Sequence, residues 1–360
     1  MIIDKDSPVP QYFQLQTWLV EQIEQGVFKP HDKIPTEHEL CRLTGLARAT
    51  VRQAIGNLVN MGYLTRKQRL GTYVSDQEID FEKRTIIGIL VPDIRTGYAP
   101  ELARGAEDEA AINRHSLILC NTDDLHLKAE HHANRLIENS VSGVIFIPTA
   151  ASDQKNRQII QRFRRRNIPI VLADRTLPGV DSDYVTTDNF DGAYRLTEYL
   201  IKNGHRKIAI TISSLFSTER QRLEGYKQAL TDHGIPIDPS LIIADSGPFV
   251  KERYFQHARK LLKQRKAFTA VFAGHDRIAL LFYSAAQELG ISIPDDLSLV
   301  GYDDLPFTTI SLTTMHQPIY EIGQESLRLI LARIRGDVSE PQQVVLKSHL
   351  VERSSVKALA

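Results

Sequence analysis

Apolar residues between positions 10 and 62 recur at helical spacing in three segments, which predicts helices over 11–25, 36–44 and 48–61. The second helix begins with a capping box, in which Thr36 accepts from the backbone three residues on and Glu39 reaches back. The third helix has core positions at Val51, Ile55, Leu58 and Val59. This leaves Arg48 and Arg52 together on another face. Two helices joined by a tight glycine-containing turn, Thr44-Gly45, predict a helix-turn-helix, whose second helix can present side chains to the major groove of DNA.

Two short alternating segments, 63–66 and 72–74, are predicted to be strands of a hairpin with a basic tip at 67–71. Such a tip suits contact with phosphates or with the minor groove. Between Leu40 and Ser75 the sequence holds no Asp or Glu. The cations of this stretch are Arg42, Arg48, Arg52, Arg66, Lys67 and Arg69. A local basic stripe is typical of a phosphate-facing surface, although the formal net charge of the whole chain is zero.

From residue 85 onward, short apolar segments alternate with amphipathic ones. The predicted strands are Ile86–Val91, Leu117–Cys120, Val144–Ile147, Ile170–Ala173, Ile208–Ile212, Leu241–Ala244, Ala270–Ala273, Leu297–Tyr302 and Thr313–His316. The predicted helices between them include Glu101–Asn113, Gly192–Asn203, Arg220–His233, Arg277–Leu289 and Ile319–Ile334. This alternation predicts an α/β fold with parallel sheets covered by helices on both faces, and roughly 270 residues of it favour two doubly wound lobes.

Ligands of such folds bind beyond the carboxyl ends of the strands. Polar residues that follow predicted strands are therefore candidates for a binding site: Asp93, Tyr98, Asp174, Arg175, Asp276 and Asp303.

The composition is that of a soluble globular protein, with 42% hydrophobic and 24% charged residues. The N-terminal segment lacks the cationic start and apolar run of a signal peptide, and no later stretch reaches the ~18–20 apolar residues of a membrane span. The two cysteines, Cys41 and Cys120, fall in different predicted domains, which excludes a disulfide framework. We therefore expect a cytoplasmic protein without a membrane partner.

The first 75 residues carry a series of motifs that strongly resembles the GntR-type winged helix. The matching motifs are Pro10-x-Tyr12, Gly26-x-x-x-Pro30, Ile34-Pro35-Thr36-Glu37-x-Glu39-Leu40, Ala49-Thr50-Val51-Arg52-x-Ala54, Leu58-x-x-x-Gly62-Tyr63 and Gly71-Thr72-Tyr73-Val74. The resemblance implies DNA contacts from Arg48, Thr50, Arg52 and the wing around Gly71. The full set of candidate DNA contacts is Thr36, Glu37, His38, Arg48, Thr50, Arg52, Lys67, Arg69 and Gly71.

Two residues depart from this family pattern. His38 stands where the family usually has a DNA-contacting arginine, so that contact is expected to be weaker or pH-sensitive. Ala47 replaces the usual serine cap of the reading helix, at a cost of roughly 0.5–2 kcal/mol. The alternative use of such a domain is a winged helix that contacts proteins.

Motifs across nearly all of 85–355 resemble the LacI/GalR-type effector domain, which has the periplasmic-binding-protein fold. They are Gly88-Ile89-Leu90-Val91-Pro92, Ser142-Gly143-Val144-Ile145, Asp174-Arg175, Asp188-Asn189-x-x-Gly192, Asn203-Gly204-His205-Arg206-Lys207-Ile208-Ala209, Arg222-x-x-Gly225-Tyr226, Asp276-x-x-Ala279, Ile293-Pro294-x-Asp296-Leu297-Ser298-Leu299-Val300-Gly301-Tyr302-Asp303-Asp304 and Leu312-Thr313-Thr314. With its GntR-type head, the whole chain resembles the arabinose-repressor type of regulator.

This second resemblance implies a small-molecule effector, most simply a monosaccharide such as a pentose. The candidate effector contacts are Tyr98, Asp174, Arg175, Arg222, Phe249, His275, Asp276, Asp303 and Gln317. Carboxylates accept from vicinal hydroxyls, arginines donate in a fork, and an aromatic face covers the C–H side of a sugar. His275 departs from the asparagine that often precedes the aspartate, which leaves the identity of the effector open.

We expect a DNA-binding domain over 1–75, a linker over 76–84 and an effector-binding and dimerisation domain over 85–360. One lobe of the latter covers about 85–186 and 318–345, and the other about 187–315 and 346–355. The expected partners are double-stranded operator DNA, the effector and a second copy of the chain, with no cofactor and no metal. The expected function is a sugar-released repressor. The alternatives are an activator, a purine- or nucleoside-responsive regulator, a corepressor-dependent regulator and a solute-binding protein.

Other motifs are interpreted structurally. His131-His132 point about 100° apart on a helix and are a poor metal pair. The segment Thr187-x-Asn189-x-Asp191-Gly192 approaches a calcium loop but lacks its first aspartate, so helix capping is favoured. The cations of 162–166 end an amphipathic helix, where they favour the helix dipole. No Walker loop, GxGxxG or GxSxG motif suggests an enzyme.

Overall fold

The computed structural model describes residues 3–4, 7, 9–60, 62–67, 70–75, 85–95, 97–213, 216–246, 249–264, 267–306 and 310–359. Two compact units divide the chain: Met1–Thr85 with Ile112–His115, and Ile86–Ala111 with Ser116–Ala360. Arg69 and the linker predicted over 76–84 lie outside the described residues, and the predicted domain boundaries stay a prediction.

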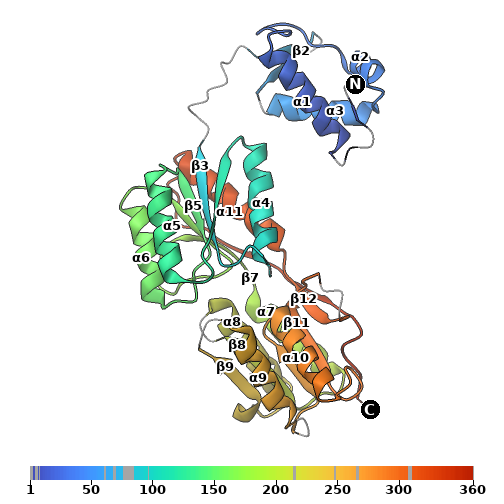
Figure 1. Cartoon of the computed structure of the whole chain (residues 1–360), viewed down its shortest axis with the longest axis vertical. Coiled ribbons are helices and arrows are strands. Elements are labelled where there is room, and N and C mark those ends of the chain that lie inside the picture. The colour runs from blue at the N-terminus through green and yellow to red at the C-terminus, as the bar shows by residue number, and fades with distance from the viewer. Residues whose placement is uncertain are drawn as a thin grey trace. The chain divides into compact units, whose positions relative to one another are not determined.

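The first unit holds three helices and a two-stranded sheet (Figure 1). Its elements are α1 (Gln11–Glu24), α2 (Glu37–Thr44), α3 (Arg48–Asn60), β1 (Leu64–Lys67) and β2 (Gly71–Val74). The predicted capping box is present: Thr36 accepts from the backbone N–H of Glu39, and the Glu39 carboxylate accepts from the Thr36 N–H at 2.8 Å. Gly45 ends α2 in the left-handed conformation, with φ of 72°. Local sequence signals therefore set both ends of this short helix.

The core of the first unit lies among its three helices and the sheet. Buried apolar residues come from every element, including Leu19 of α1, Leu40 of α2 and Leu58 of α3. In the wing, β1 and β2 pair antiparallel from Leu64↔Val74 to Lys67↔Gly71. The hairpin therefore packs against the helix-turn-helix through Leu64 and Val74, while most of β1 is exposed.

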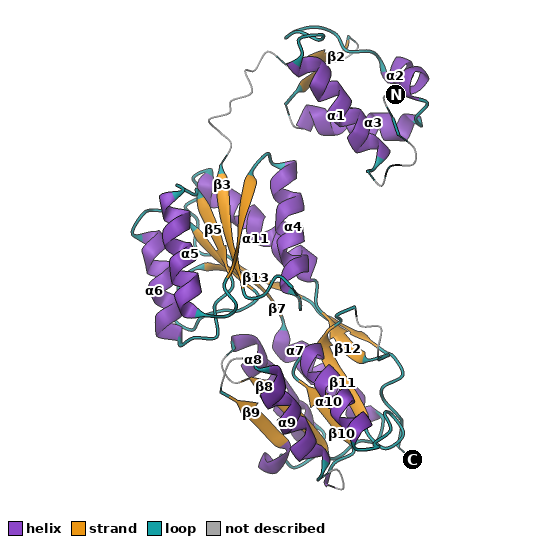
Figure 2. Cartoon of the chain, in the orientation of Figure 1, coloured by secondary structure: helices purple, strands orange, loops and turns teal. Residues whose placement is uncertain are grey.

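The second unit holds two six-stranded sheets (Figure 2). The first, in the order β13-β7-β6-β5-β3-β4, is made of β3 (Ile86–Val91), β4 (Ser116–Asn121), β5 (Gly143–Phe146), β6 (Ile170–Ala173), β7 (Asp183–Thr187) and β13 (Gln343–Leu346). The second, in the order β14-β12-β11-β10-β8-β9, is made of β8 (Ile208–Ser213), β9 (Ile242–Asp245), β10 (Ala270–Ala273), β11 (Ser298–Asp303), β12 (Thr313–His316) and β14 (His349–Val351). All pairs are parallel except β12 with β14, an antiparallel edge strand on an otherwise parallel sheet.

Helices cover both faces of each sheet. They are α4 (Ala99–Ile112), α5 (His126–Glu138), α6 (Asp153–Arg164), α7 (Asn189–Lys202), α8 (Ser217–Asp232), α9 (Lys251–Leu262), α10 (Asp276–Glu288) and α11 (Ile319–Ile334), with a short 3-10 turn at Pro239–Leu241. Helices α4 and α11 pack on one face of the first sheet and α5 and α6 on the other (Figure 2). On the second sheet, α9 and α10 cover one face and α7 and α8 the other. The α/β fold with two doubly wound lobes is therefore confirmed.

Glycines permit close helix crossings in this unit. A Cβ on Gly105 of α4 would lie 2.0 Å from the Tyr320 carbonyl oxygen of α11, and one on Gly323 of α11 would lie 2.1 Å from the Leu102 carbonyl oxygen. Both obstacles are backbone atoms, so α4 and α11 can approach this closely only without side chains at these positions.

The structure also adds three strands that the sequence did not predict, β7, β13 and β14. Strands β13 and β14 are three or four residues long, half exposed and at the edges of their sheets. Asp188 caps α7 by accepting from the Asp191 N–H at 2.9 Å, which confirms the capping interpretation of the calcium-like segment. Within the described residues no helix is long and apolar enough to cross a membrane.

Candidate DNA-binding and effector-binding sites

The Glu37 carboxylate holds two exposed arginines of the first unit together. Glu37, the first residue of α2, accepts from Arg48 Nε at 3.1 Å and from Arg52 Nε and Nη2 at 3.3 Å each. Arg48 and Arg52 are one turn apart on α3 and remain 73% and 58% exposed. The hydrogen bond from Arg52 is the main reason that the pKa of Glu37 lies below its usual value. Glu37 thus holds both guanidinium groups side by side at the start of the predicted reading helix.

The other predicted DNA contacts occupy the same unit. His38 is exposed, Thr50 is half-buried, and the Thr36 hydroxyl is engaged in the capping box. Lys67 is exposed at the end of β1, where its ammonium lies 4.8 Å from the centre of the Tyr73 ring. Gly71 begins β2 with φ of 121°, a conformation that side chains disfavour. A tight turn at the wing tip therefore requires glycine at that position.

A cavity with an empty volume of about 640 Å³ lies in the second unit. Eight of the nine predicted effector contacts line it: Tyr98, Asp174, Arg175, Arg222, Phe249, His275, Asp303 and Gln317. It is also lined by Pro92, Asp93, Gly97, Ala99, Asp124, Phe216, Thr218, Glu219 and Arg277. These residues come from the ends of strands in both sheets and from the helices that follow, as expected for a doubly wound fold.

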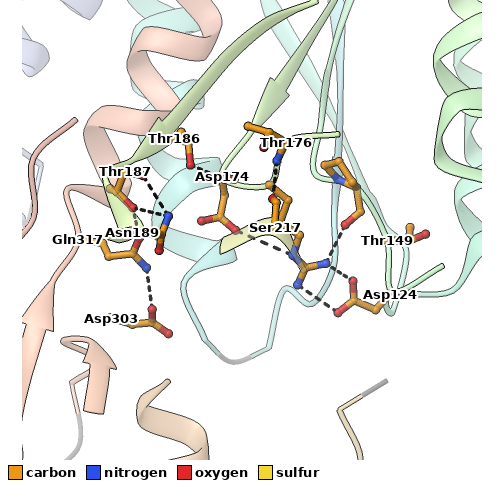
Figure 3. Close-up of polar contacts among 12 residues, drawn as sticks. Asp124, Thr149, Asp174, Thr176, Thr186, Thr187, Asn189, Ser217, Asp303 and Gln317 are labelled. Carbon is orange, nitrogen blue, oxygen red and sulfur yellow. Dashed lines mark hydrogen bonds and ion pairs between the residues drawn. The ribbon is translucent and has the colours of Figure 1, made fainter. Parts of the chain in front are cut away.

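Part of the cavity lining centres on Arg175, whose partners Asp124 and Asp174 are labelled in Figure 3. Its guanidinium donates to Asp124 Oδ1 at 2.5 Å and to the Pro148 carbonyl at 2.7 Å, and lies 3.9 Å from Asp174 Oδ2. Phe216, which precedes α8, stacks over the same guanidinium at 3.7 Å. Burial opposes the charged form, but Asp124, Tyr98 and Asp174 together more than offset it, so the pKa of Arg175 is raised. Arg175 is therefore a fixed cation.

Another part of the lining centres on Arg222 of α8. It donates to Asn189 Oδ1 at 2.8 Å and to the Gly274 carbonyl at 2.7 Å, and its Nη2 lies 3.6 Å from Asp303 Oδ1. Gln317 donates to the same Asp303 oxygen at 2.6 Å and accepts from the Thr187 hydroxyl at 2.5 Å (Figure 3). Asp303 Oδ2 has no hydrogen-bond partner among the described residues. It is thus free to accept from a ligand.

Backbone strain is concentrated at this site. Asp174 has φ of 60°, Asp303 of 116° and Asp304 of 59°. Positive φ is uncommon for residues other than glycine, and such strain persists where the surrounding structure requires it, often at functional sites. Here it places two carboxylates at the ends of β6 and β11 facing one cavity.

The cavity also perturbs its ionisable groups. Burial raises the pKa of Asp174 and of Asp303, and the neighbouring arginines only partly offset it. Burial likewise raises the pKa of Glu219 to about 7. Burial, with Arg277 as the next cause, lowers the pKa of His275 well below its usual value. Perturbed pKa values of this kind are typical of functional sites.

His275 and Phe249 form an aromatic part of the lining, with ring centres 5.4 Å apart. His275 Nδ1 accepts from the Ile278 N–H at 3.3 Å and caps α10. The neutral ring therefore carries its proton on Nε2 and offers a donor, where the asparagine of the family pattern could also accept. Arg277 stacks over Phe249 at 4.3 Å and lies 4.0 Å from Asp93 Oδ2.

Asp276 is the predicted effector contact that the structure does not bring to the cavity. Its Oδ1 accepts from the Thr314 hydroxyl at 2.7 Å and its Oδ2 from the Leu305 N–H at 2.8 Å. Both oxygens are engaged and the residue is buried, so the geometry assigns Asp276 a structural role at the start of α10.

Sequence reasoning missed Asp124, Phe216, Thr218, Glu219 and Arg277. Asp124 follows β4 closely, so the strand-end rule could have found it. Glu219 and Thr218 lie in the first turn of α8, where helical spacing from Arg222 gave a signal that was not used.

Comparison with known proteins agrees with this geometry. Residues 11–74 match the bacterial regulatory proteins of the gntR family, and residues 197–356 match the periplasmic binding protein-like domain. The chain is 30% identical over 370 residues to the arabinose metabolism transcriptional repressor of Geobacillus stearothermophilus, an alignment that covers 99% of this chain and 100% of that protein.

Solved structures resemble the second unit. A LacI family transcriptional regulator from Enterococcus faecium with bound ribose has a TM-score of 0.66 and 33% identity, covering 76% of this chain and 100% of that one. Transcription regulator CcpA of Lactococcus lactis has a TM-score of 0.70 and 26% identity, with the same coverage. These proteins are transcription regulators, and the two family matches fall in the two predicted regions, so both sequence resemblances are confirmed. The chain therefore belongs to the family of bacterial transcription regulators that join a gntR-type DNA-binding domain to a periplasmic-binding-protein-like domain, the family of the arabinose repressor.

Proposed function

We propose that this chain represses a sugar-utilisation operon and leaves its operator when a neutral monosaccharide binds the cavity of the second unit. The observation that carries the proposal is the charge of the lining: five carboxyl groups (Asp93, Asp124, Asp174, Glu219 and Asp303) face three guanidinium groups (Arg175, Arg222 and Arg277). The carboxylates that are ionised disfavour phosphates and sugar acids, whereas the hydroxyls of a sugar can hydrogen-bond with a carboxyl group in either protonation state. The names of the arabinose repressor and of the ribose-bound regulator support a pentose.

In this proposal Asp174 and Asp303 accept from sugar hydroxyls, and Arg175, Arg222 and His275 Nε2 donate to sugar oxygens. Phe249 covers the apolar side of the ring, and Tyr98 and Gln317 complete the lining. Because the contacts come from both lobes, a bound sugar favours one lobe arrangement. It shifts the equilibrium only by its differential affinity for the two arrangements. A coupling of about 1–3 kcal/mol, or roughly 5–150-fold in operator affinity, is typical.

The operator is proposed to be read by α3, with Arg48, Thr50 and Arg52 in the major groove, and by the wing, with Lys67, Arg69 and Gly71 at the backbone or minor groove. Thr36, Glu37 and His38 would lie at the adjacent N-terminus of α2. A single winged domain buries only about 600–1,000 Å² on DNA, so useful affinity favours a homodimer on two half-sites. Since its target is bacterial DNA, the protein is proposed to act in the cytoplasm.

The test is a thermal-shift screen of the full chain against neutral pentoses and hexoses, sugar phosphates, nucleosides and purine bases. A neutral sugar is expected to raise the unfolding temperature and, in a second assay, to weaken DNA binding. A hit confined to sugar phosphates, nucleosides or purines would contradict the proposed effector. A sugar that strengthens DNA binding would identify a corepressor mechanism and contradict release.

A further inference from the structure

Glu219 is a buried acid that neither family resemblance explains. It lies in the first turn of α8, three residues before Arg222, so both side chains lie on one face of the helix. It is 3% exposed and lines the same cavity as Asp174, Arg222 and His275. Burying a carboxyl group this deeply costs folding free energy unless hydrogen bonds or an ion pair compensate it.

The described residues satisfy Glu219 only partly. Its Oε2 accepts from the Ser213 N–H at 2.6 Å, and the described residues supply no second hydrogen bond and no ion pair within 4.0 Å. Arg222, three residues further along the helix, already donates to Asn189 and to the Gly274 carbonyl. Space beside Oε2 is tight, since a Cβ on Gly274 would lie 2.7 Å from it. Glu219 can therefore make a further hydrogen bond through its other carboxyl oxygen, Oε1. Since Glu219 lines the cavity, a bound ligand can supply the partner.

We infer that Glu219 contacts the effector directly and selects it by one hydroxyl group. This inference rests on the proposed function, because it assumes a neutral sugar in the cavity. A carboxyl group matches a hydroxyl in either protonation state: the anion accepts from it, and the acid donates to it. The anion repels a phosphate or carboxylate at the same place. Asp174, Asp303 and Glu219 then read different hydroxyls, so Glu219 sets which stereoisomer binds.

Isothermal titration calorimetry of the full chain tests this with three proteins: the parent, Glu219→Gln and the control Glu224→Gln. Glu224 lies on the same helix but is exposed and pairs with Lys227. Each protein is titrated with the best-binding neutral sugar and with its monodeoxy analogues at pH 6 and pH 8.5. Gln keeps an oxygen for the Ser213 N–H, so the fold is expected to survive, and thermal unfolding checks this.

At pH 8.5, Glu219→Gln is expected to weaken the sugar at least about tenfold, the size typical of a lost hydrogen bond to a charged group, while Glu224→Gln binds like the parent. One deoxy analogue should bind the parent and Glu219→Gln with nearly equal affinity, because the hydroxyl that Glu219 reads is absent. The gap between the parent and Glu219→Gln should narrow at pH 6, where the buried carboxyl group, whose pKa is about 7, holds a proton and resembles the amide.

The outcomes separate the two claims. If the parent binds no neutral sugar, the proposed function fails and this inference fails with it. If the parent binds a sugar, and Glu219→Gln binds it with the same affinity and ranks the deoxy analogues in the same order, only this inference is overturned. An equal loss for the sugar and every analogue would also overturn it, because a merely structural residue acts in that way.

Discussion

The substitution Asp303→Asn should weaken effector binding without destabilising the protein. Asparagine suits this position for two reasons. It keeps an oxygen that can accept from Gln317 Nε2, now at 2.6 Å from Asp303 Oδ1, and it tolerates the φ of 116° about as well as aspartate. It removes the free acceptor Oδ2 and, at pH 8.5, above the raised pKa of about 7, it also removes the charge. At that pH the loss for a sugar is that of one hydrogen bond to a charged group, about 1.5–3 kcal/mol. This corresponds to about 10–150-fold in Kd.

The effect on stability has the opposite sign. Burial raises the pKa of Asp303, so the native state retains a proton that the unfolded state has released. The free energy of unfolding of the parent therefore falls as the pH rises through this range. The asparagine of the variant does not titrate, so the variant has no such loss. The stability of Asp303→Asn relative to the parent should therefore increase from pH 5.5 to pH 8.5. Urea unfolding and sugar calorimetry at both pH values measure the two effects, with DNA binding as the control that should not change. A variant that is less stable at pH 8.5 yet binds the sugar normally would refute the reasoning.

Three further predictions follow from other parts of the structure. Arg52→Ala should weaken specific operator binding by about 1–3 kcal/mol if Arg52 makes a bidentate base contact, and Arg48→Ala should weaken it too; unchanged binding of both variants in a gel-shift assay would remove α3 from the groove. Gly105→Ala should lower stability by about 1–3 kcal/mol, because its Cβ would lie 2.0 Å from the Tyr320 carbonyl oxygen. The Cβ of Gly56→Ala in α3 would meet nothing within 4 Å, so this variant should be neutral or stabilising by up to about 1 kcal/mol. Equal unfolding temperatures for the two variants in calorimetry would contradict this. Finally, the pKa of Glu219 is about 7 in the native state against an ordinary 4.5. The ligand-free parent should therefore lose up to about 3 kcal/mol of stability between pH 5 and pH 8, and Glu219→Gln should not. Parallel curves of stability against pH for the two proteins would contradict a raised pKa of Glu219.

The first unit was predictable because its signals are local. The capping box of Thr36 and Glu39 and the turn at Gly45 set α2, and the apolar period of α3 turned Arg48 and Arg52 outward together. The buried strands of the second unit were predictable for a similar reason, since each is a short apolar run. Strands β13 and β14 were not, because an edge strand is half exposed and is stabilised by its partner strand and not by its own composition.

The site was predictable where residues follow strands, as Asp174 and Asp303 do. It was not predictable where distant contacts decide the role of a residue. Asp276 has the side chain and the sequence position expected of a ligand contact, but its two carboxylate oxygens accept hydrogen bonds from the Thr314 hydroxyl and the Leu305 N–H. Glu219 lies in α8, several residues beyond the end of β8, so the rule that selects residues directly after strands did not reach it; the assembled cavity shows that its carboxyl group is buried there.

Fluorescence anisotropy with the full chain and a labelled operator fragment, selected from a random-sequence DNA library, tests the central claim most directly. The chain is first bound to the DNA, and the neutral sugar found by thermal shift is then titrated in. The account predicts release, with operator affinity falling about 5–150-fold as the sugar saturates, and no release from the Asp303→Asn variant at the same sugar concentration. Operator affinity that stays constant while calorimetry shows the sugar bound would contradict the account, because the cavity and the DNA-binding head would then be uncoupled.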